Sequence, residues 1–238
     1  MRKQPTGELC AGDSLARFEG RGGASYPYGY LAYNCQRVKS KMFRLPINRL
    51  RTVQCRIRAF VTTLLTGVKF KVVGTNCKIL GSNILVGENV CIGDFCWIEA
   101  VNRYKIEKTS QIFSPLIRLG NNVAMSDFVH ISAVMNVDIH DGVLIGSKVY
   151  IGDHSHGSSK IDKWQKIREI PPRSRPLDDI APISIGQNCW IGDNVVILAG
   201  AKIGRNCIIA ANSVVKGQYE DDKIIGGIPS AVLKDLMK

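Results

Sequence analysis

Residues 185–215 read IGQNCW IGDNVV ILAGAK IGRNCI IAANSV V, and this stretch decides the fold. An aliphatic residue opens every block of six, and the fifth residue of each full block is small. The aliphatic members are Ile185, Ile191, Ile197, Ile203, Ile209 and Val215. A period of six excludes an amphipathic helix, in which apolar residues recur at intervals of three and four. The stretch therefore predicts a repeat of short strands joined by tight turns.

The same repeat occurs twice more towards the N-terminus. Its members are Leu119, Met125, Ile131, Ile139, Ile145 and Ile151, and a looser copy comprises Val73, Ile79, Val86, Ile92 and Ile98. Three hexads close a triangular coil of about eighteen residues, and a coil buries its aliphatic side chains only by stacking on another. Gly, Asn and Asp between the strands tolerate the positive φ that the corners need. The sequence predicts an all-β protein, a parallel β-helix over residues 66–220.

Two segments interrupt the repeat. The first covers residues 101–116, and the second covers residues 152–182 and is rich in Ser, Pro and Arg. The second is typical of an excursion loop that leaves the coil and returns, and a loop of this length is more often functional than idle. We expect a β-helix domain at 66–220 with a loop at 152–182, preceded by an N-terminal extension at 1–65 and followed by a tail or cap at 221–238.

The formal net charge of +12 is concentrated near the N-terminus. Residues 20–87 contain twelve Lys and Arg and no Asp or Glu, so the rest of the chain is balanced, with 20 basic and 20 acidic residues. Such a block favours anionic partners, for example lipid phosphates or a nucleotide-like cofactor. No helix-turn-helix, zinc-finger or aromatic RNA-binding pattern accompanies the charge, which argues against nucleic acid.

Residues 49–65 have helical potential, with a basic first half and an apolar second half. Two interpretations remain open for this part of the basic extension. In the first, it is a cap helix that closes the open end of the stacked coils, because such ends need a cap. In the second, it makes a peripheral contact with a membrane surface.

The cysteines indicate a reducing compartment, in which disulfides do not persist. None of the eight forms a C-x-x-C pair, so a zinc site is not expected. Four occupy small positions of the repeat and are expected to be core thiols: Cys77, Cys96, Cys189 and Cys207. We see neither an apolar leader nor an apolar run of about 18 residues. A cytoplasmic protein is expected, at the inner face of the membrane if the N-terminal segment binds lipid.

His154 and His156 lie where the second copy of the repeat ends and the loop begins. Acyl transfer to a hydroxyl requires a base that works near neutral pH, and imidazole suits that task. A histidine at the edge of a coil is exposed enough to meet a substrate and rigid enough to be aimed. Asp153 either orients an imidazole or forms the turn. The alternative is that both histidines are surface residues without a role.

Several stretches resemble the hexapeptide-repeat acyltransferases, and most closely the lipopolysaccharide (O-antigen) O-acetyltransferases. They are DFVHIS at 127–132, IGSKVYIGDHSHG at 145–157, PRSRPL at 172–177, IGQNCWIGDNVVIL at 185–198, ANSVV at 211–215 and GGIP at 226–229. The resemblance covers the chain from about residue 70 to its end. It implies a left-handed β-helix, acetyl-CoA as co-substrate, no metal, and a homotrimer with its sites between subunits.

The resemblance also implies roles for individual residues. His154 matches the general base of the family, and His156 is an alternative base or a substrate contact. Asp127 and His130 match positions that face the acceptor sugar in relatives, or else they are structural polar residues. Two further substrate contacts are implied. They are Arg175 in the loop and Trp190, whose ring would stack on the sugar or the pantetheine arm, or pack against a neighbouring subunit.

The cofactor would lie along the last coils, where small residues let pantetheine approach the backbone. These residues are Gly192, Ala199 and Ala211, although the corners of a coil need small residues as well. Relatives usually carry Lys or Arg two residues after the proline of the G-x-P motif, where it meets coenzyme A phosphates. Here Pro229 is followed by Ser230 and Ala231. Lys216 or Lys234 would have to replace that contact.

The sequence therefore predicts an acetyl-CoA-dependent O-acetyltransferase that modifies a sugar hydroxyl in surface polysaccharide (O-antigen or capsule) biosynthesis. The acceptor is a sugar or a lipid-linked oligosaccharide. No Ser or Cys lies in a nucleophile motif, so no covalent acyl-enzyme is expected. The alternatives are an N-acetyltransferase acting on an amino sugar or small amine, and a non-catalytic scaffold. The γ-type carbonic anhydrases share the fold, but the spacing of His154 and His156 does not resemble their zinc site.

Overall fold

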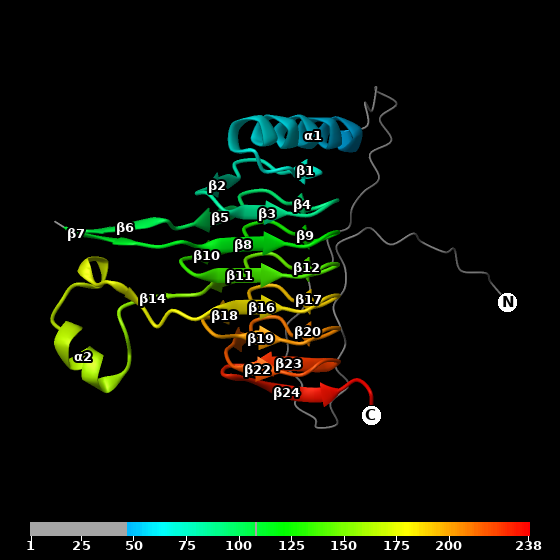
Figure 1. Cartoon of the computed structure of the whole chain (residues 1–238). Coiled ribbons are helices and arrows are strands. Elements are labelled where there is room, and N and C mark those ends of the chain that lie inside the picture. Colours follow the sequence, from blue (N-terminus) through cyan, green and yellow to red (C-terminus); the bar gives the residue numbers. More distant parts are fainter. Residues whose placement is uncertain (1–46, 108) are drawn as a thin grey trace, which may run out of the picture. The chain divides into compact units, whose positions relative to one another are not determined.

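A computed structural model describes residues 47–107 and 109–238, and its strands form three mainly parallel sheets around a common core (Figure 1). Each coil contributes one short strand to each sheet, so neighbouring strands in a sheet come from successive coils. This arrangement confirms the predicted parallel β-helix. Residues 1–46, which include most of the basic N-terminal extension, lie outside the described residues.

The three sheets are named here faces A, B and C. Face A consists of β1 (Val72–Val73), β4 (Cys91–Ile92), β9 (Ala124–Met125), β12 (Leu144–Ile145), β17 (Trp190–Ile191), β20 (Ile208–Ile209), β23 (Lys223–Gly227) and the antiparallel β24 (Ser230–Asp235). Face B consists of β2 (Lys78–Leu80), β5 (Trp97–Ala100), β10 (His130–Ala133), β13 (Tyr150–Gly152), β18 (Val196–Leu198) and β21 (Val214–Val215). Face C consists of β3 (Ile84–Val86), β8 (Leu116–Leu119), β11 (Asn136–Ile139), β16 (Ile183–Ile185), β19 (Lys202–Ile203) and β22 (Gln218–Tyr219).

The aliphatic residues of the repeat form straight columns inside the coils. On face B, Ile131 pairs with Ile151 and Ile151 pairs with Ile197, and none of the three is exposed to solvent. A parallel register of this kind puts equivalent positions of successive coils directly above one another. Three cysteines at the small positions of the repeat are buried, as predicted. They are Cys96, Cys189 and Cys207.

Asn and Gly have different roles at the corners. Asn188 and Asn206 adopt φ of 59° and 56°, the left-handed conformation that Asn tolerates better than most residues. Gly186 does not need a positive φ, but a Cβ added there would lie 2.6 Å from the carbonyl carbon of Gly204 in the next coil. Gly186 is therefore required by the close approach of two coils rather than by its own backbone conformation.

Both interruptions of the repeat leave the coils between face B and face C. The first forms an antiparallel hairpin of β6 (Arg103–Ile106) and β7 (Thr109–Ile112). Figure 1 shows this hairpin and the second interruption projecting from the same side of the stack. The second contains β14 (Ser155–His156), α2 (Ile161–Ile167), a short 3-10 helix (Pro172–Ser174) and β15 (Leu177–Asp178), with β14 and β15 paired antiparallel.

Helix α1 (Ile47–Thr66) precedes the first coil and contacts β1. Its Ala59 is 3% exposed and belongs to the same buried cluster as Phe70 and Val73 of that coil. Among the described residues, no helix combines the length and hydropathy needed to cross a bilayer. The structure therefore places one helix against the N-terminal coil.

The columns predict a large difference in stability between inward and outward positions. Ile197→Ala removes a fully buried side chain between two coils and should lower the free energy of unfolding by about 2–5 kcal/mol. Leu85→Ala on face C, where the side chain is exposed, is the matched control and should change it by less than about 1 kcal/mol. Urea denaturation followed by circular dichroism measures both, and equal effects would contradict the assigned register.

Candidate active site

A buried acidic side chain holds His154 where face B ends. His154 follows β13 by two residues, and its Nδ1 lies 3.0 Å from Oδ1 of the adjacent Asp153. Asp153 is fully buried, and only 9% of the His154 side chain is exposed. The two residues form a carboxylate–imidazole pair at the corner between faces B and C.

The backbone of the preceding coil binds the Asp153 carboxylate. The N–H of Val134 donates to Oδ1 at 2.9 Å, and the N–H groups of Met135 and Asn136 donate to Oδ2 at 2.8 and 2.9 Å. Successive N–H groups of one turn make an anion-binding nest. Because a carboxylate only accepts hydrogen bonds, the Nδ1 of His154 carries the proton in their contact. Nε2 of His154 is then the nitrogen with a free lone pair.

The loop and the coils beneath it enclose a groove of about 840 Å³ beside His154. It is lined by residues of α2, by the two ends of the loop and by residues 198–199. A groove of this size is typical of small-molecule and cofactor sites. The structure brings five of the predicted site residues together along it. They are His154, His156, Arg175, Ala199 and Lys216.

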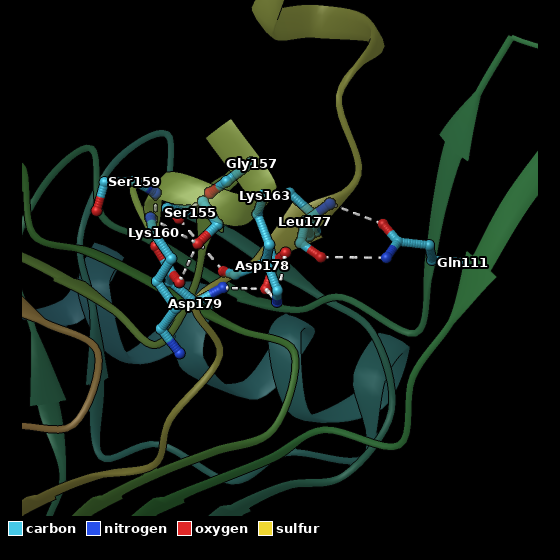
Figure 2. A network of polar contacts seen from close by, with 10 residues as sticks. Gln111, Ser155, Gly157, Ser159, Lys160, Lys163, Leu177, Asp178 and Asp179 are labelled. Carbon is cyan, nitrogen blue, oxygen red and sulfur yellow. Dashed lines mark hydrogen bonds and ion pairs between the residues drawn. The ribbon is translucent and has the colours of Figure 1, made fainter. Parts of the chain in front are cut away.

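Figure 2 shows the polar network that fixes the shape of the loop. Lys163 Nζ on α2 lies 2.7 and 2.9 Å from the two carboxylate oxygens of Asp178. This hydrogen-bonded pair lowers the pKa of Asp178 and raises the pKa of Lys163. Asp179 accepts the Ser158 hydroxyl at 2.7 Å and the Ser159 N–H at 3.2 Å. These contacts join α2 and the start of the loop to the returning strand β15.

The hairpin of the first interruption braces the same loop, which the sequence did not predict. Gln111 on β7 donates its Nε2 hydrogen to the Leu177 carbonyl at 3.1 Å and accepts the Leu177 N–H on Oε1 at 2.7 Å. Tyr104 on β6 donates its hydroxyl to the Arg173 carbonyl at 3.0 Å. The only signal in the sequence is the polar–apolar alternation of residues 103–106, which is typical of a strand.

His156 and Arg175 line the groove but already have partners within the protein. The Nδ1 of His156 lies 3.2 Å from the Tyr104 hydroxyl, and the two rings meet edge-on with centroids 5.5 Å apart. The Arg175 guanidinium donates to the Ile170 carbonyl at 2.8 Å and lies 5.1 Å from the centroid of the Trp164 ring. Arg175 therefore ties the loop to itself while its side chain forms part of the wall.

His130 and Asp127 lie outside the groove. His130 stacks on Trp97 on face B, with ring centroids 4.6 Å apart. Burial lowers the pKa of His130, and the nearby His154 lowers it further. Asp127 Oδ1 accepts the N–H of Asp94 at 2.7 Å at the corner before face B. In this chain Asp127 therefore connects two successive coils.

Trp190 lies on face A, on a different side of the coil from His154. Its indole is about one-third exposed and stands in register with the exposed Leu144. One chain therefore does not bring Trp190 into the groove that His154 lines.

The residues predicted to bind the cofactor divide into two groups. Ala199 and Lys216 line the groove, as described above. Lys234 lies on β24 at the C-terminal end of the stack and outside the groove. A Cβ at Gly192 would lie 2.7 Å from the backbone nitrogen of Ala211 in the next coil, so stacking alone requires a glycine there.

Comparison with known proteins agrees with this architecture. The family model described as bacterial transferase hexapeptide (six repeats) matches residues 182–217, which span the most regular part of the repeat. Over these residues the chain resembles the hexapeptide-repeat family. Its fold is the left-handed parallel β-helix that the resemblance implied.

Two curated relatives of this chain come from Escherichia coli. "Putative lipopolysaccharide biosynthesis O-acetyl transferase WbbJ" is 40% identical over 102 residues, which cover 43% of this chain and 52% of WbbJ. Galactoside O-acetyltransferase is 40% identical over 55 residues, which cover 23% of this chain and 27% of that protein. The matched region therefore spans about half the length of WbbJ and about a quarter of the length of galactoside O-acetyltransferase.

The solved structures that are similar to this chain include a variant of AntD, an N-acyltransferase from Bacillus cereus, in complex with dTDP and coenzyme A. The TM-score is 0.53 at 17% identity, and the match covers 74% of this chain and 87% of that one. At this identity the comparison shows a shared fold.

The bracing hairpin leads to a prediction about the loop. Gln111→Ala removes both hydrogen bonds to Leu177 and should increase amide hydrogen exchange at Leu177 by about tenfold or more, because each hydrogen bond contributes about 1 kcal/mol. Lys105→Ala on the same hairpin is the control and should leave exchange unchanged. Exchange measured by NMR or mass spectrometry that is equal in the two variants would show that the hairpin does not brace the loop.

Proposed function

We propose that this protein transfers the acetyl group of acetyl-CoA to a sugar hydroxyl during surface polysaccharide biosynthesis. The observation that carries the proposal is the Asp153–His154 pair at the edge of the groove. A buried carboxylate that fixes the tautomer of an imidazole is a common way to prepare a general base. The names of WbbJ and galactoside O-acetyltransferase support a hydroxyl acceptor and, for WbbJ, lipopolysaccharide.

In the proposed reaction, Nε2 of His154 removes the proton of the acceptor hydroxyl as its oxygen attacks the thioester carbonyl. The new C–O bond forms and the C–S bond breaks, and the proton passes from the imidazolium to the departing thiolate. Asp153 stabilises the imidazolium formed on the way, because its carboxylate accepts the Nδ1 hydrogen throughout. This scheme needs neither a metal nor a covalent acyl-enzyme.

The groove is also our proposed position for acetyl-CoA. Ala199 leaves space at its base, and Lys216 adds a cation for which the structure shows no acidic partner among the described residues. Ala231 occupies the position where relatives usually carry a basic residue after the G-x-P motif. Lys216 is therefore a better candidate than Lys234 for the contact with the coenzyme A phosphates. The complex of AntD with coenzyme A is consistent with such a donor.

A homotrimer is part of the proposal. Trp190 and Leu144 expose apolar surface on face A, whereas His154 lies at the far edge of face B. Packing face A of one subunit against the groove of another would cover that surface and add an indole to the site. We place the reaction in the cytoplasm, with a sugar or a lipid-linked oligosaccharide as acceptor.

The proposal predicts unequal effects of substituting the two loop histidines. His154→Gln should lower kcat by about 100-fold or more, because it removes the base. His156→Gln should have a smaller effect, because His156 contacts Tyr104 rather than a carboxylate. Release of the coenzyme A thiol, with polysaccharide precursors as acceptors, measures both variants, and the exposed His140→Gln is the control.

Other outcomes of that assay would reject parts of the proposal. Unchanged turnover in His154→Gln would reject this histidine as the base. Turnover with amino sugars alone would favour N-acetylation. Absence of turnover with every acceptor, although acetyl-CoA binds, would favour a non-catalytic scaffold.

A second prediction concerns the cofactor. Lys216→Ala should raise the KM for acetyl-CoA by about fivefold, in line with the loss of one exposed ion pair worth up to about 1 kcal/mol, and the effect should weaken at high salt. Lys234→Ala, outside the groove, should leave KM unchanged. Steady-state kinetics at two ionic strengths provides the comparison, and the reverse pattern would place the phosphates near the C-terminal hairpin.

A further inference from the structure

Helix α1 contacts the coils through its small and polar residues. Cys55 and Ala59 are buried, and Ala59 belongs to the core cluster of the coils. Thr62 and Thr63, which follow at helical spacing on the same side, are half-buried. An ordinary surface helix packs its apolar side against the protein. Helix α1 instead turns its small and polar side towards the coils.

The opposite side of α1 is apolar and exposed to solvent. Its members recur at intervals of three and four, and their exposed fractions range from 45% to 76%. They are Leu50, Val53, Ile57, Phe60, Val61 and Leu64, and we call them the outer face of α1. Figure 1 shows that α1 lies across one end of the stack, whereas β24 lies at the other end. A continuous apolar stripe of this kind marks an interaction surface.

Positive charge accompanies the outer face. Residues 47–87 contain seven Lys and Arg and no Asp or Glu. Arg56 is exposed on the helix, and Lys69 and Lys71 are exposed just after it. Arg51 is paired with Asp94 of a neighbouring coil at 2.8 Å. A partner for this end of the protein must therefore be both apolar and anionic.

We propose that the outer face of α1 docks on an anionic lipid bilayer, with the helix lying in the plane of the interface. The apolar side chains enter the boundary between headgroups and acyl chains, and Arg56 with the adjacent lysines meets the lipid phosphates. A nucleic acid would use the charge but leave the apolar stripe exposed, and an apolar protein surface would leave the charge unmatched. This docking is independent of acyl transfer.

The test is flotation of the full-length protein with vesicles. One set contains equal parts of phosphatidylcholine and phosphatidylglycerol, and the other contains phosphatidylcholine alone. Phe60→Gln combined with Leu64→Gln should weaken binding to the mixed vesicles by about tenfold or more, since two large side chains no longer leave water. Arg56→Gln should weaken it by about fivefold and should not affect neutral vesicles, because one cation near an anionic surface contributes about 1 kcal/mol.

The matched control is Met237→Gln, which alters an equally exposed side chain two residues after β24 and should bind like wild type. Circular dichroism verifies that each variant is folded, and glutamine preserves helix propensity. Wild-type protein that stays unbound would overturn the proposal in favour of cover by residues 1–46 or by a second copy. Vesicle binding that does not depend on Phe60 and Leu64 would overturn it as well. So would binding to RNA in preference to vesicles.

Discussion

Each coil buries one aliphatic side chain on each face directly above its counterpart in the next coil, and the rest of the structure depends on this stacking. On face B, Ile151 pairs with Ile131 on one side and Ile197 on the other, without exposed surface. An extra residue within a strand would move a column out of the core, because side chains alternate between the two sides of a sheet. Additional chain is therefore accommodated only at corners.

The candidate site uses three successive corners between faces B and C. The hairpin leaves at the first, a tight turn at residues 133–136 closes the second, and the long loop leaves at the third. The tight turn has N–H groups to spare, and these bind Asp153. The hairpin reaches past this turn to Leu177. The hairpin and the long loop share no pattern in the sequence, yet both support one groove.

The sequence predicted the β-helix because a period of six has few structural solutions and recurs along most of the chain. It also pointed to His154, because the repeat stops there. It could not predict the nest around Asp153, since those N–H groups become available only when two coils stack. The contact of Gln111 with Leu177 joins residues 66 positions apart, and no periodic pattern links them. Residues such as Gly192, predicted for the cofactor, have a sufficient reason in the stacking itself.

The nest has a consequence for assembly. Asp153 belongs to one coil and its N–H donors belong to the coil before, so the imidazole of His154 is oriented only when both coils have docked in the correct register. A chain with a slipped coil would keep much of its secondary structure but leave the carboxylate without its donors. Under the proposed mechanism, misassembled molecules would therefore be inactive rather than poorly selective, and the groove would become competent only in a completed stack.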